Sequence, residues 1–243
     1  MHIVLCSFSY IAIFLVAVDG FELSELGIKK CRLEDAECVL TSFRLAVPRF
    51  VQGIPEYGVE VMDEMVLGNI KFDITGLKLT LSDARLQGDK GIMVDSAKLD
   101  TSNKIITVEY HVPLYILTGH YNTDGKLLTI PVQGDGDIEI TLRNVVIGSK
   151  SNYDLLKKDG KSYITLKQNS YDFTIGDAHY NLTNLFRGSK QLSETTLKFI
   201  NDNSKDLTLE FGKPVLDAVA KKTFKNIKKF LAKVPLEDIS IID

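Results

Sequence analysis

Apolar and polar residues alternate along the middle of the chain, from residue 68 to about residue 175. An alternating pattern places every second side chain on one face of a strand, so this region is predicted to form antiparallel strands with one buried face. The longest run, residues 105–118, would span about 46 Å at the usual rise per residue. A strand of that length has to bend or coil, so we expect a strongly curved sheet. The sequence NTDGK at residues 122–126 predicts a hairpin turn.

A spacing typical of α-helices precedes and follows the alternating region. Apolar residues recur at this spacing over residues 39–51, and again from Leu192 to Leu231. The second stretch fits one long helix or two stacked helices, with a break or kink at residues 212–214, because glycine and proline interrupt helices. A long apolar helix has to be covered along its length, and the one-sided sheet is the available partner. We therefore predict an α+β fold in which a long C-terminal helix is wrapped by a highly curved antiparallel β-sheet, with an elongated hydrophobic tunnel inside.

The N-terminal 20 residues have the pattern of a secretory signal peptide. An apolar run covers residues 10–18 and is followed by Asp19 and Gly20, where cleavage is predicted. The run is too short to cross a bilayer, and a buried amphipathic helix is the alternative interpretation. We expect residues 1–20 to be a signal peptide, residues 21–243 to form a single domain, and the mature protein to be secreted into an extracellular fluid.

Cys31 and Cys38 are the cysteines that remain once the signal peptide, with Cys6, is removed. Two cysteines in an oxidising compartment favour a disulfide. Seven helical residues rise about 10.5 Å, whereas bridged Cα atoms lie about 4.4 to 6.8 Å apart, so the chain has to double back between them. A zinc site needs more ligands than two thiolates, and a thioredoxin-like redox pair has the spacing C-x-x-C. We predict a structural disulfide, with a helix starting near the end of its loop.

Composition and charge are those of a globular protein, with 44% hydrophobic and 25% charged residues and a net charge of −3. This balance gives no overall basic character, so no nucleic-acid partner is expected. The tripeptide Asn181-Leu182-Thr183 is an N-glycosylation sequon. Asn181 is therefore a candidate glycosylation site in a secreted chain.

Motifs that would indicate catalysis are weak or incomplete. The sequence DGKS at residues 159–162 resembles the end of a phosphate-binding loop that lacks its first glycine, and GDGD at residues 134–137 lacks the spacing of an EF-hand. His111, His120 and His179 show no metal-ligand spacing and no evident carboxylate partner. We predict no enzymatic activity, no metal and no cofactor.

Several longer stretches resemble one family of insect proteins. They are C-x6-C at Cys31 and Cys38, GIPEYGVEVMDEM at residues 53–65, GDGDIEITLRNV at residues 134–145, LFRGSKQLSETTLKFINDN at residues 185–203 and NIKKFLAKVPLEDI at residues 226–239. In the order and spacing of these stretches, nearly all of the mature chain resembles the insect takeout and haemolymph juvenile-hormone-binding protein family.

The resemblance implies a tubular lipid-binding fold and one terpenoid, juvenile-hormone-like or fatty-type ligand in an internal tunnel. Hormone binders of the family have a second cysteine pair in their later half, and this chain has no cysteine after Cys38. It is therefore more similar to the takeout branch, whose members are associated with circadian, feeding and chemosensory physiology. The implied function is a monomeric secreted carrier, in haemolymph or a similar fluid. The alternative is a secreted signalling or interaction protein that acts through its surface and uses its tunnel only structurally.

The candidate ligand-binding residues are side chains expected to face the tunnel. Binding an apolar ligand requires apolar area, which contributes roughly 25 cal/mol for each Å² removed from water. The hydroxyl group of Tyr110 can in addition hydrogen-bond a polar group of the ligand. Packing in the core is the simpler interpretation of each residue. The candidates are Phe43, Val47, Phe50, Val108, Tyr110, Val112, Leu114, Ile116, Ile130, Val132, Ile138, Ile140, Phe211, Val215, Val219 and Phe224.

A lysine-rich face is predicted on the C-terminal helix, opposite its apolar side. Such a face can dock on an anionic membrane surface to load or unload a ligand. The simpler interpretation is that this face is the solvated outer side of a helix whose other side is buried. Transient membrane contact is therefore a hypothesis for this face, which consists of Lys221, Lys222, Lys225, Lys228, Lys229 and Lys233.

Overall fold

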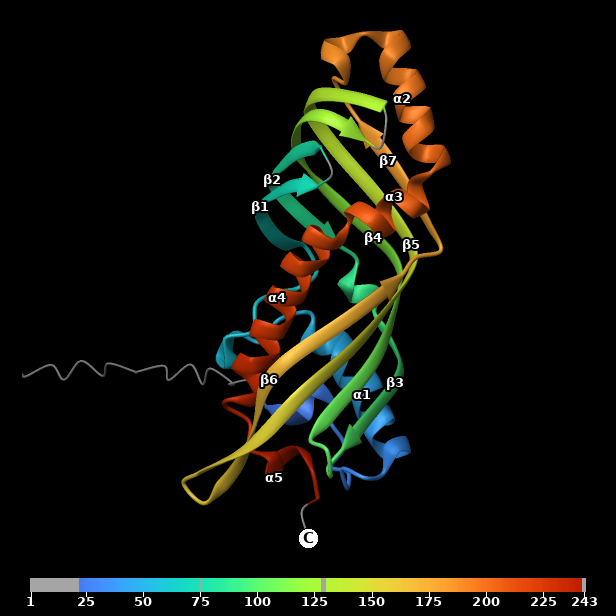
Figure 1. Ribbon diagram of the computed structural model, residues 1–243. Helices are drawn as coiled ribbons and strands as arrows, with labels where there is room; N and C mark the ends of the chain where they lie inside the picture. Colours follow the sequence, from blue (N-terminus) through green and yellow to red (C-terminus); the bar gives the residue numbers. More distant parts are fainter. Residues whose placement is uncertain (1–21, 75, 128–129, 242–243) are drawn as a thin grey trace, which may run out of the picture.

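The computed structural model describes residues 22–74, 76–127 and 130–241, and the predicted signal peptide lies outside the described residues. One antiparallel sheet forms the centre of an elongated molecule, with helices before and after it in the sequence (Figure 1). The strands are β1 (Met65–Ile74), β2 (Leu77–Gln87), β3 (Met93–Asp100), β4 (Ile105–Leu127), β5 (Ile130–Lys158), β6 (Lys161–Thr174) and β7 (Asp177–Leu182). The helices are α1 (Ala36–Phe50), α2 (Lys190–Asp202), α3 (Ser204–Phe211), α4 (Lys213–Leu231) and α5 (Leu236–Ile239), with short 3-10 turns η1 (Leu23–Leu26), η2 (Pro55–Tyr57), η3 (Asp89–Gly91) and η4 (Phe186–Gly188).

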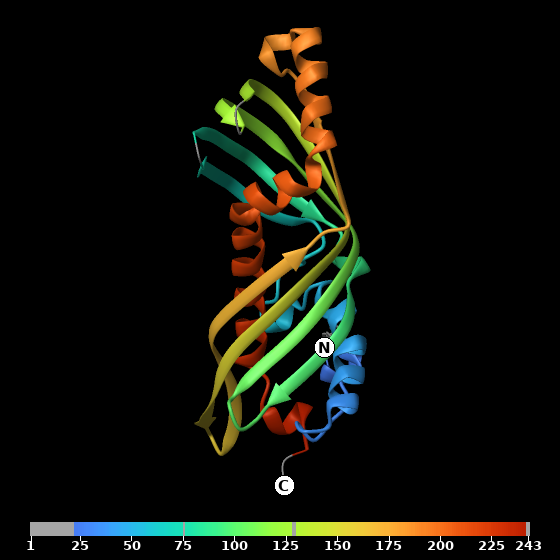
Figure 2. The ribbon, with the colours of Figure 1, turned by 45° about the vertical axis from the view of Figure 1, so that its right-hand side comes forward.

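Strands β4 and β5 are the longest strands and pair with each other along the whole molecule. Strand β3 pairs with the first part of β4 and β2 with its second part, while β7 and β6 pair with successive parts of β5. The sheet therefore has two portions that share β4 and β5. Figure 2 shows these two strands running through a waist, with β1, β2 and β7 on one side of it and β3 and β6 on the other. The prediction of a curved, one-sided antiparallel sheet is confirmed.

Both long strands exchange their inner and outer faces at the waist. Val112 and Tyr115 of β4 are both buried although they are three residues apart, and their β5 partners are Val145 and Leu142. Asn144 lies between these partners with a positive φ of 51°. At the waist each strand has two successive residues on its outer face. Because this happens at paired positions of β4 and β5, the register of their pairing is the same before and after the waist. The inner face is thus carried by even-numbered residues of β4 before Pro113 and by odd-numbered residues after it.

Two predictions for β4 are wrong because the strand exchanges its faces at the waist and continues without a turn to Leu127. Continued alternation predicts that Leu114 and Ile116 face the tunnel, whereas the exchange of faces places them on the outer side, and Leu114 is 38% exposed. The predicted hairpin at residues 122–126 lies inside β4, where Gly125 pairs with Leu77 on one side and with Val132 on the other. The sequence NTDGK is therefore part of a three-stranded pairing, and β4 continues to Leu127, which pairs with Ile130.

The predicted disulfide between Cys31 and Cys38 is present, with its Cα atoms 5.7 Å apart. The side chain of Asp35 accepts a hydrogen bond from the backbone N–H of Cys38 at 3.0 Å and so caps the start of α1. The chain doubles back between the two cysteines, and the helix begins at Ala36, near the end of the closed loop. Pro48 lies within the last turn of α1, which ends at Phe50.

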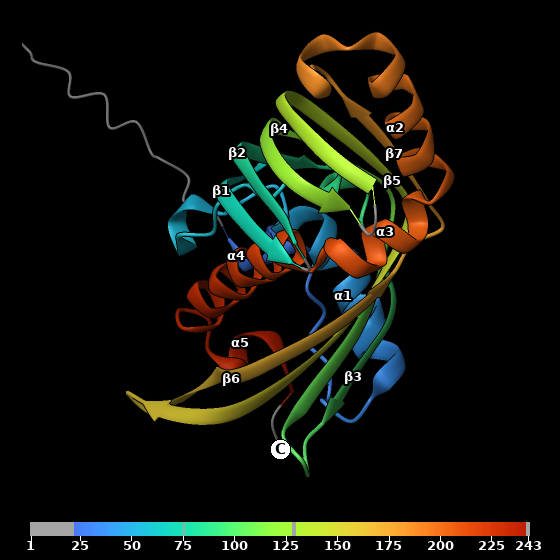
Figure 3. The same cartoon turned by 45° about the horizontal axis from the view of Figure 1, so that its top comes forward.

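Between Lys190 and Leu231 the C-terminal helical region consists of three helices, one more than the two segments that a single break would give. The break predicted at residues 212–214 occurs at Gly212, and Pro214 lies in the first turn of α4, where its missing N–H leaves no donor unpaired. A second break, at Asn203, separates α2 from α3. Helices α2 and α3 contact β7 near one end of the molecule (Figure 3), whereas α4 contacts β1 and β6 and runs along the inner side of the sheet.

Candidate ligand-binding cavities

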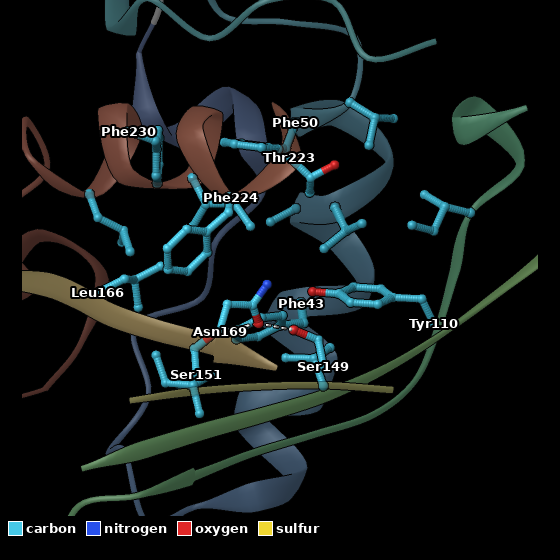
Figure 4. A pocket seen from close by; sticks show the side chains of 18 of the residues that line it. Phe43, Phe50, Tyr110, Ser149, Ser151, Leu166, Asn169, Thr223, Phe224 and Phe230 are labelled. Carbon is cyan, nitrogen blue, oxygen red and sulfur yellow. Dashed lines mark hydrogen bonds between the residues drawn. The ribbon is translucent and has the colours of Figure 1, made fainter. Parts of the chain in front are cut away.

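An apolar cavity of about 310 Å³ lies between the helices and the sheet and is called the larger cavity below. Helices α1 and α4 form one side of it, and strands β4, β5 and β6 form the other (Figure 4). The 3.6-residue period of both helices directs an apolar face toward the strands, whose inner face is apolar as well. At one end, the ring of Phe230 packs edge-on against Phe50, with centroids 5.5 Å apart.

Seven of the sixteen candidate residues line the larger cavity, and five line a second one. The smaller cavity has a volume of about 130 Å³ and lies on the other side of the waist, between β2, β4, β5, β7 and helices α2 to α4. The residues of the larger cavity are Phe43, Val47, Phe50, Val108, Tyr110, Val219 and Phe224. Those of the smaller cavity are Val132, Ile138, Ile140, Phe211 and Val215. Where the sequence predicted one elongated tunnel, the described residues line an apolar cavity on each side of the waist.

Four candidate residues line neither cavity. Val112 has no exposed surface and belongs to the packed core at the waist. Leu114 and Ile116 lie on the outer face because of the exchange of faces, and Ile130 packs against the core at the start of β5. Strict alternation assigned these four residues to the tunnel because it locates neither the exchange of faces nor the places where the interior is packed with side chains.

A small group of polar side chains interrupts the apolar wall of the larger cavity. The hydroxyl groups of Ser149 and Ser151 donate hydrogen bonds to Oδ1 of Asn169, at 3.1 and 3.2 Å, respectively. Figure 4 shows the Asn169 amide nitrogen directed into the cavity, away from the two serines. Because a serine hydroxyl can accept as well as donate, the amide can present either its NH₂ or its carbonyl group to a ligand.

Tyr110 supplies a second polar group on this wall. Its ring extends from β4 into the cavity (Figure 4), and its hydroxyl makes no hydrogen bond to another described residue. Burial raises the pKa of Tyr110 to about 12, so the hydroxyl stays protonated at physiological pH. It is thus a neutral donor and acceptor in a mostly apolar space.

Sequence patterns alone did not identify every polar residue of the wall. Ser149 and Ser151 continue the inner phase of Val145 and Ile147 along β5, so alternation could have found them once the exchange of faces was known. Asn169 is recognisable only through its contact with them. Tyr115 begins the odd-numbered inner phase of β4 and also lines the larger cavity, whereas Asp89, in the 3-10 turn η3, lines it without any periodic pattern that indicates it.

The lysine-rich face of α4 lies beside the segment that follows α1. Nζ of Lys229 and Lys222 lie 3.0 and 3.7 Å from the carboxylate of Glu60. Nζ of Lys233 donates to the backbone carbonyl of Glu56 at 2.9 Å. Half of the predicted face is therefore engaged within the protein. The other three lysines of the face are Lys221, Lys225 and Lys228, and all three are exposed.

His120 has two carboxylate partners, contrary to the expectation from the sequence. Its Nε2 lies 2.7 Å from Oδ1 of Asp135 and its Nδ1 lies 3.2 Å from Oδ1 of Asp137. The hydrogen bonds to Asp137 and Asp135 raise the pKa of His120. Alternation along β5 places both carboxylates on the outer face, where register sets them opposite β4. The GDGD sequence therefore lies inside a strand.

Other kinds of site are absent from the part of the chain that the structure describes. No group of three or more His, Cys, Asp or Glu side chains is arranged there to hold a metal ion. No described helix combines the length and the apolar character that a membrane-spanning segment requires. Asn181, the candidate glycosylation site, is exposed on β7.

Comparison with known proteins gives consistent matches over most of the chain. The family model of the haemolymph juvenile hormone binding protein (JHBP) matches residues 9–241. The circadian clock-controlled protein daywake of Drosophila melanogaster is 29% identical over 233 residues, which cover 91% of this chain and 90% of that protein. A Schistocerca gregaria protein named "Putative beta-carotene-binding protein" is 30% identical over 108 residues, 44% of this chain and 43% of that protein. The crystal structure of Takeout 1 from Epiphyas postvittana is 43% identical, covers 88% of this chain and 100% of that chain, and has a TM-score of 0.85.

Proposed function

The chain belongs to the haemolymph juvenile hormone binding protein family, and from that premise we propose that it is a secreted carrier for one small hydrophobic ligand. The observation that carries the proposal is the larger cavity, about 310 Å³ in volume and lined mainly by apolar side chains. This volume lies at the lower end of the range of small-molecule pockets and suits a single terpenoid or fatty chain. Juvenile hormone, named in the family description, and β-carotene, named for one relative, are both hydrophobic.

Apolar contact supplies the binding free energy in this proposal. Burial of about 400 Å² of ligand surface would contribute on the order of 10 kcal/mol before the costs of association. Phe43, Val108 and Phe224 lie on α1, β4 and α4 and would contact the ligand from three directions. The seven candidate residues on this cavity are the proposed ligand site, while the five on the smaller cavity are proposed to line a second chamber.

Tyr110 and Asn169 are proposed to orient the ligand. Each presents a hydrogen-bonding group to the cavity that is not satisfied by the other described residues. Neither group is charged, so the pair suits a neutral oxygen function such as an ester, ketone or ether, or the carbonyl end of a longer lipid. A purely hydrocarbon ligand would leave both groups unpaired, which costs free energy.

Secretion and the physiological setting are part of the same proposal. The disulfide of Cys31 and Cys38 and the haemolymph family support an extracellular location. The sequence similarity to daywake supports a link with circadian physiology. Transient membrane contact is proposed only for the exposed part of the lysine-rich face, and the protein is proposed to act as a monomer.

Native mass spectrometry of protein secreted from insect cells tests the carrier proposal. A co-purifying lipid, or uptake of one lipid per chain from a lipid extract, is expected. Ala220→Trp places a large side chain on the wall of the larger cavity and is expected to reduce this uptake. Leu45→Trp, at an exposed position of α1 that lines neither cavity, is the control and is expected to bind as the wild type does.

The outcomes separate the carrier from the alternative function. A lipid-free mass with no uptake from extracts contradicts the carrier and favours a surface-acting signalling protein. Uptake that is equal in Ala220→Trp and Leu45→Trp would show that the ligand binds outside the larger cavity.

A further inference from the structure

Asp89 is the one acidic side chain among the described residues that line the larger cavity. It is only 6% exposed, although a carboxylate is among the groups that are most costly to remove from water. Its location needs a physical explanation, because an apolar or amide side chain would fit an apolar wall at lower cost. The proposed function above does not use this residue.

Tyr115 accounts for one of the two carboxylate oxygens of Asp89. Its hydroxyl donates to Oδ1 at 2.5 Å, and the Tyr115 side chain is itself 5% exposed. The second oxygen makes no hydrogen bond to another described residue. The neighbouring cation is engaged elsewhere, since Nζ of Lys90 pairs with Asp63, at 3.3 Å. Asp89 thus carries an acceptor that the described residues leave unpaired.

The turn that carries Asp89 is held rigidly. Oδ1 of Asp63 accepts hydrogen bonds from the N–H groups of Gly88 and Lys90, at 2.8 and 3.3 Å, so the residues on both sides of Asp89 are fixed. Gly88 has a φ of 136°, and a Cβ atom there would lie 2.2 Å from the carbonyl oxygen of Leu114. The backbone of the turn therefore packs directly on β4, next to Tyr115. A carboxylate placed in this way is preorganised for a partner.

Asp89 and the polar group formed by Asn169, Ser149 and Ser151 lie at different positions along the length of the cavity. Ser149, which contacts Asn169, is paired with Val108 of β4. Tyr115 is seven residues further along the same strand, or about 23 Å at the usual rise. An extended ligand can therefore meet the two polar positions with different parts of its structure.

The chemistry of an unpaired buried carboxylate selects among hydrophobic ligands. A ligand carboxylate would be repelled by it, because two like charges in a site of low dielectric disfavour each other. An ether or ester oxygen has no hydrogen to donate and would leave Asp89 unpaired. An ammonium group would have to lose its hydration for one acceptor. A hydroxyl group carries one donor and no charge, and its hydrogen bond to a carboxylate is of the stronger, charge-assisted kind.

We propose that the Asp89–Tyr115 pair binds the hydroxyl end of a hydrophobic alcohol inside the larger cavity, with the free oxygen of Asp89 as the acceptor. This inference rests on the proposed carrier function and specifies its ligand class. Asp89 is then a specificity-determining residue, and Tyr115 is a positioning residue that holds the carboxylate in place.

Two probes with the same hydrocarbon chain test the inference: farnesol and farnesyl methyl ether. Their dissociation constants are measured at pH 7.4 by displacement of 1,6-diphenylhexatriene, a fluorescent hydrocarbon without hydrogen-bond donors. The wild type is expected to prefer farnesol by roughly tenfold. Asp89→Leu is expected to abolish this preference, and Asp89→Asn, which keeps an acceptor of the same shape, to retain part of it. Tyr115→Phe is expected to reduce the preference without removing it.

Every outcome of these binding measurements either supports or overturns the proposed role of Asp89. Equal affinity of the wild type for the two probes, or an unchanged preference in both Asp89 variants, overturns the inference while displacement of diphenylhexatriene leaves the carrier standing. Failure of the wild type to bind any of the three compounds overturns the carrier and the inference together. Circular dichroism confirms that each variant is folded, and Asp89→Asn provides the answer if Asp89→Leu does not fold.

Discussion

Cys31 and Ser240, near the two ends of the described chain, form a parallel β-bridge. The N–H of Ile241 donates to the carbonyl oxygen of Cys31 at 2.9 Å, next to this bridge. Cys31 is also joined to Cys38 in the first turn of α1. The disulfide therefore links α1 to the segment that follows α4, and these are the two helices that form the helical side of the larger cavity.

Removal of this disulfide is expected to destabilise the protein. In Cys31→Ser/Cys38→Ser, the unfolded chain regains the entropy of the closed loop, which corresponds to about 2.5 kcal/mol. Urea denaturation followed by circular dichroism measures the change in the free energy of unfolding. Reduced wild-type protein is the control and is expected to show the same loss. A double variant as stable as the oxidised wild type would contradict this role of the bridge.

Alanine at Gly88 is expected to cost roughly 3 kcal/mol or more, because it combines a left-handed backbone with a clash against the Leu114 carbonyl. Gly160 provides the matched control, since its φ is also positive, at 77°, but a Cβ atom there would meet nothing within 4 Å among the described residues. Gly160→Ala is expected to cost only about 1 kcal/mol. Thermal unfolding of the two variants measures the difference, and equal losses would show that the Gly88 contact contributes little.

The stability of the protein is expected to depend on pH through Asp89. Burial raises its pKa from 3.8 to about 6, partly offset by the Tyr115 hydrogen bond, and Asp63 adds to the rise. The Asp89 carboxyl ionises at a lower pH in the unfolded chain than in the folded protein. Its contribution to the free energy of unfolding is therefore fully present below pH 3.8 and is lost as the pH rises through about 6. The full difference is about 3 kcal/mol.

Asp89→Asn cannot titrate and isolates this contribution. The stability of the wild type relative to the variant is expected to fall between pH 4 and pH 6.5, as measured by urea denaturation at a series of pH values. Subtraction of the two stability curves removes the contributions of other carboxylates, such as Asp154 and Asp217. Their pKa values are lowered in the folded protein, so their contributions to stability increase as the pH rises. A flat difference curve would show that Asp89 titrates normally.

His120 is expected to titrate above its ordinary value of 6.5, since hydrogen bonds to Asp137 and Asp135 favour its charged form. Its contribution to stability is present below pH 6.5 and is lost as the pH rises through the raised pKa. An NMR titration of the imidazole resonances measures this pKa. Asp137→Asn is expected to lower it, and an unchanged value in both Asp137→Asn and Asp135→Asn would mean that the two contacts are absent in solution.

Periodicity and composition were sufficient for the class and order of the elements. Alternation identified the sheet, helical spacing identified α1 and α4, and the cysteine spacing identified the disulfide, because each depends on local geometry. The places where that geometry changes were not predictable: the exchange of faces around Pro113 and the break at Asn203 result from tertiary packing. The same limit applies to the site. Phe43 and Phe224 follow from helical faces, whereas Asp89 and Asn169 are polar residues that only the assembled cavity explains.

The waist, where β4 and β5 exchange faces, has a consequence for how such a chain can diversify. Residues before and after it on the same pair of strands serve different chambers, so each chamber can be enlarged or altered chemically by substitutions that never touch the other. The same two strands thereby line two cavities whose ligand preferences can change independently in evolution.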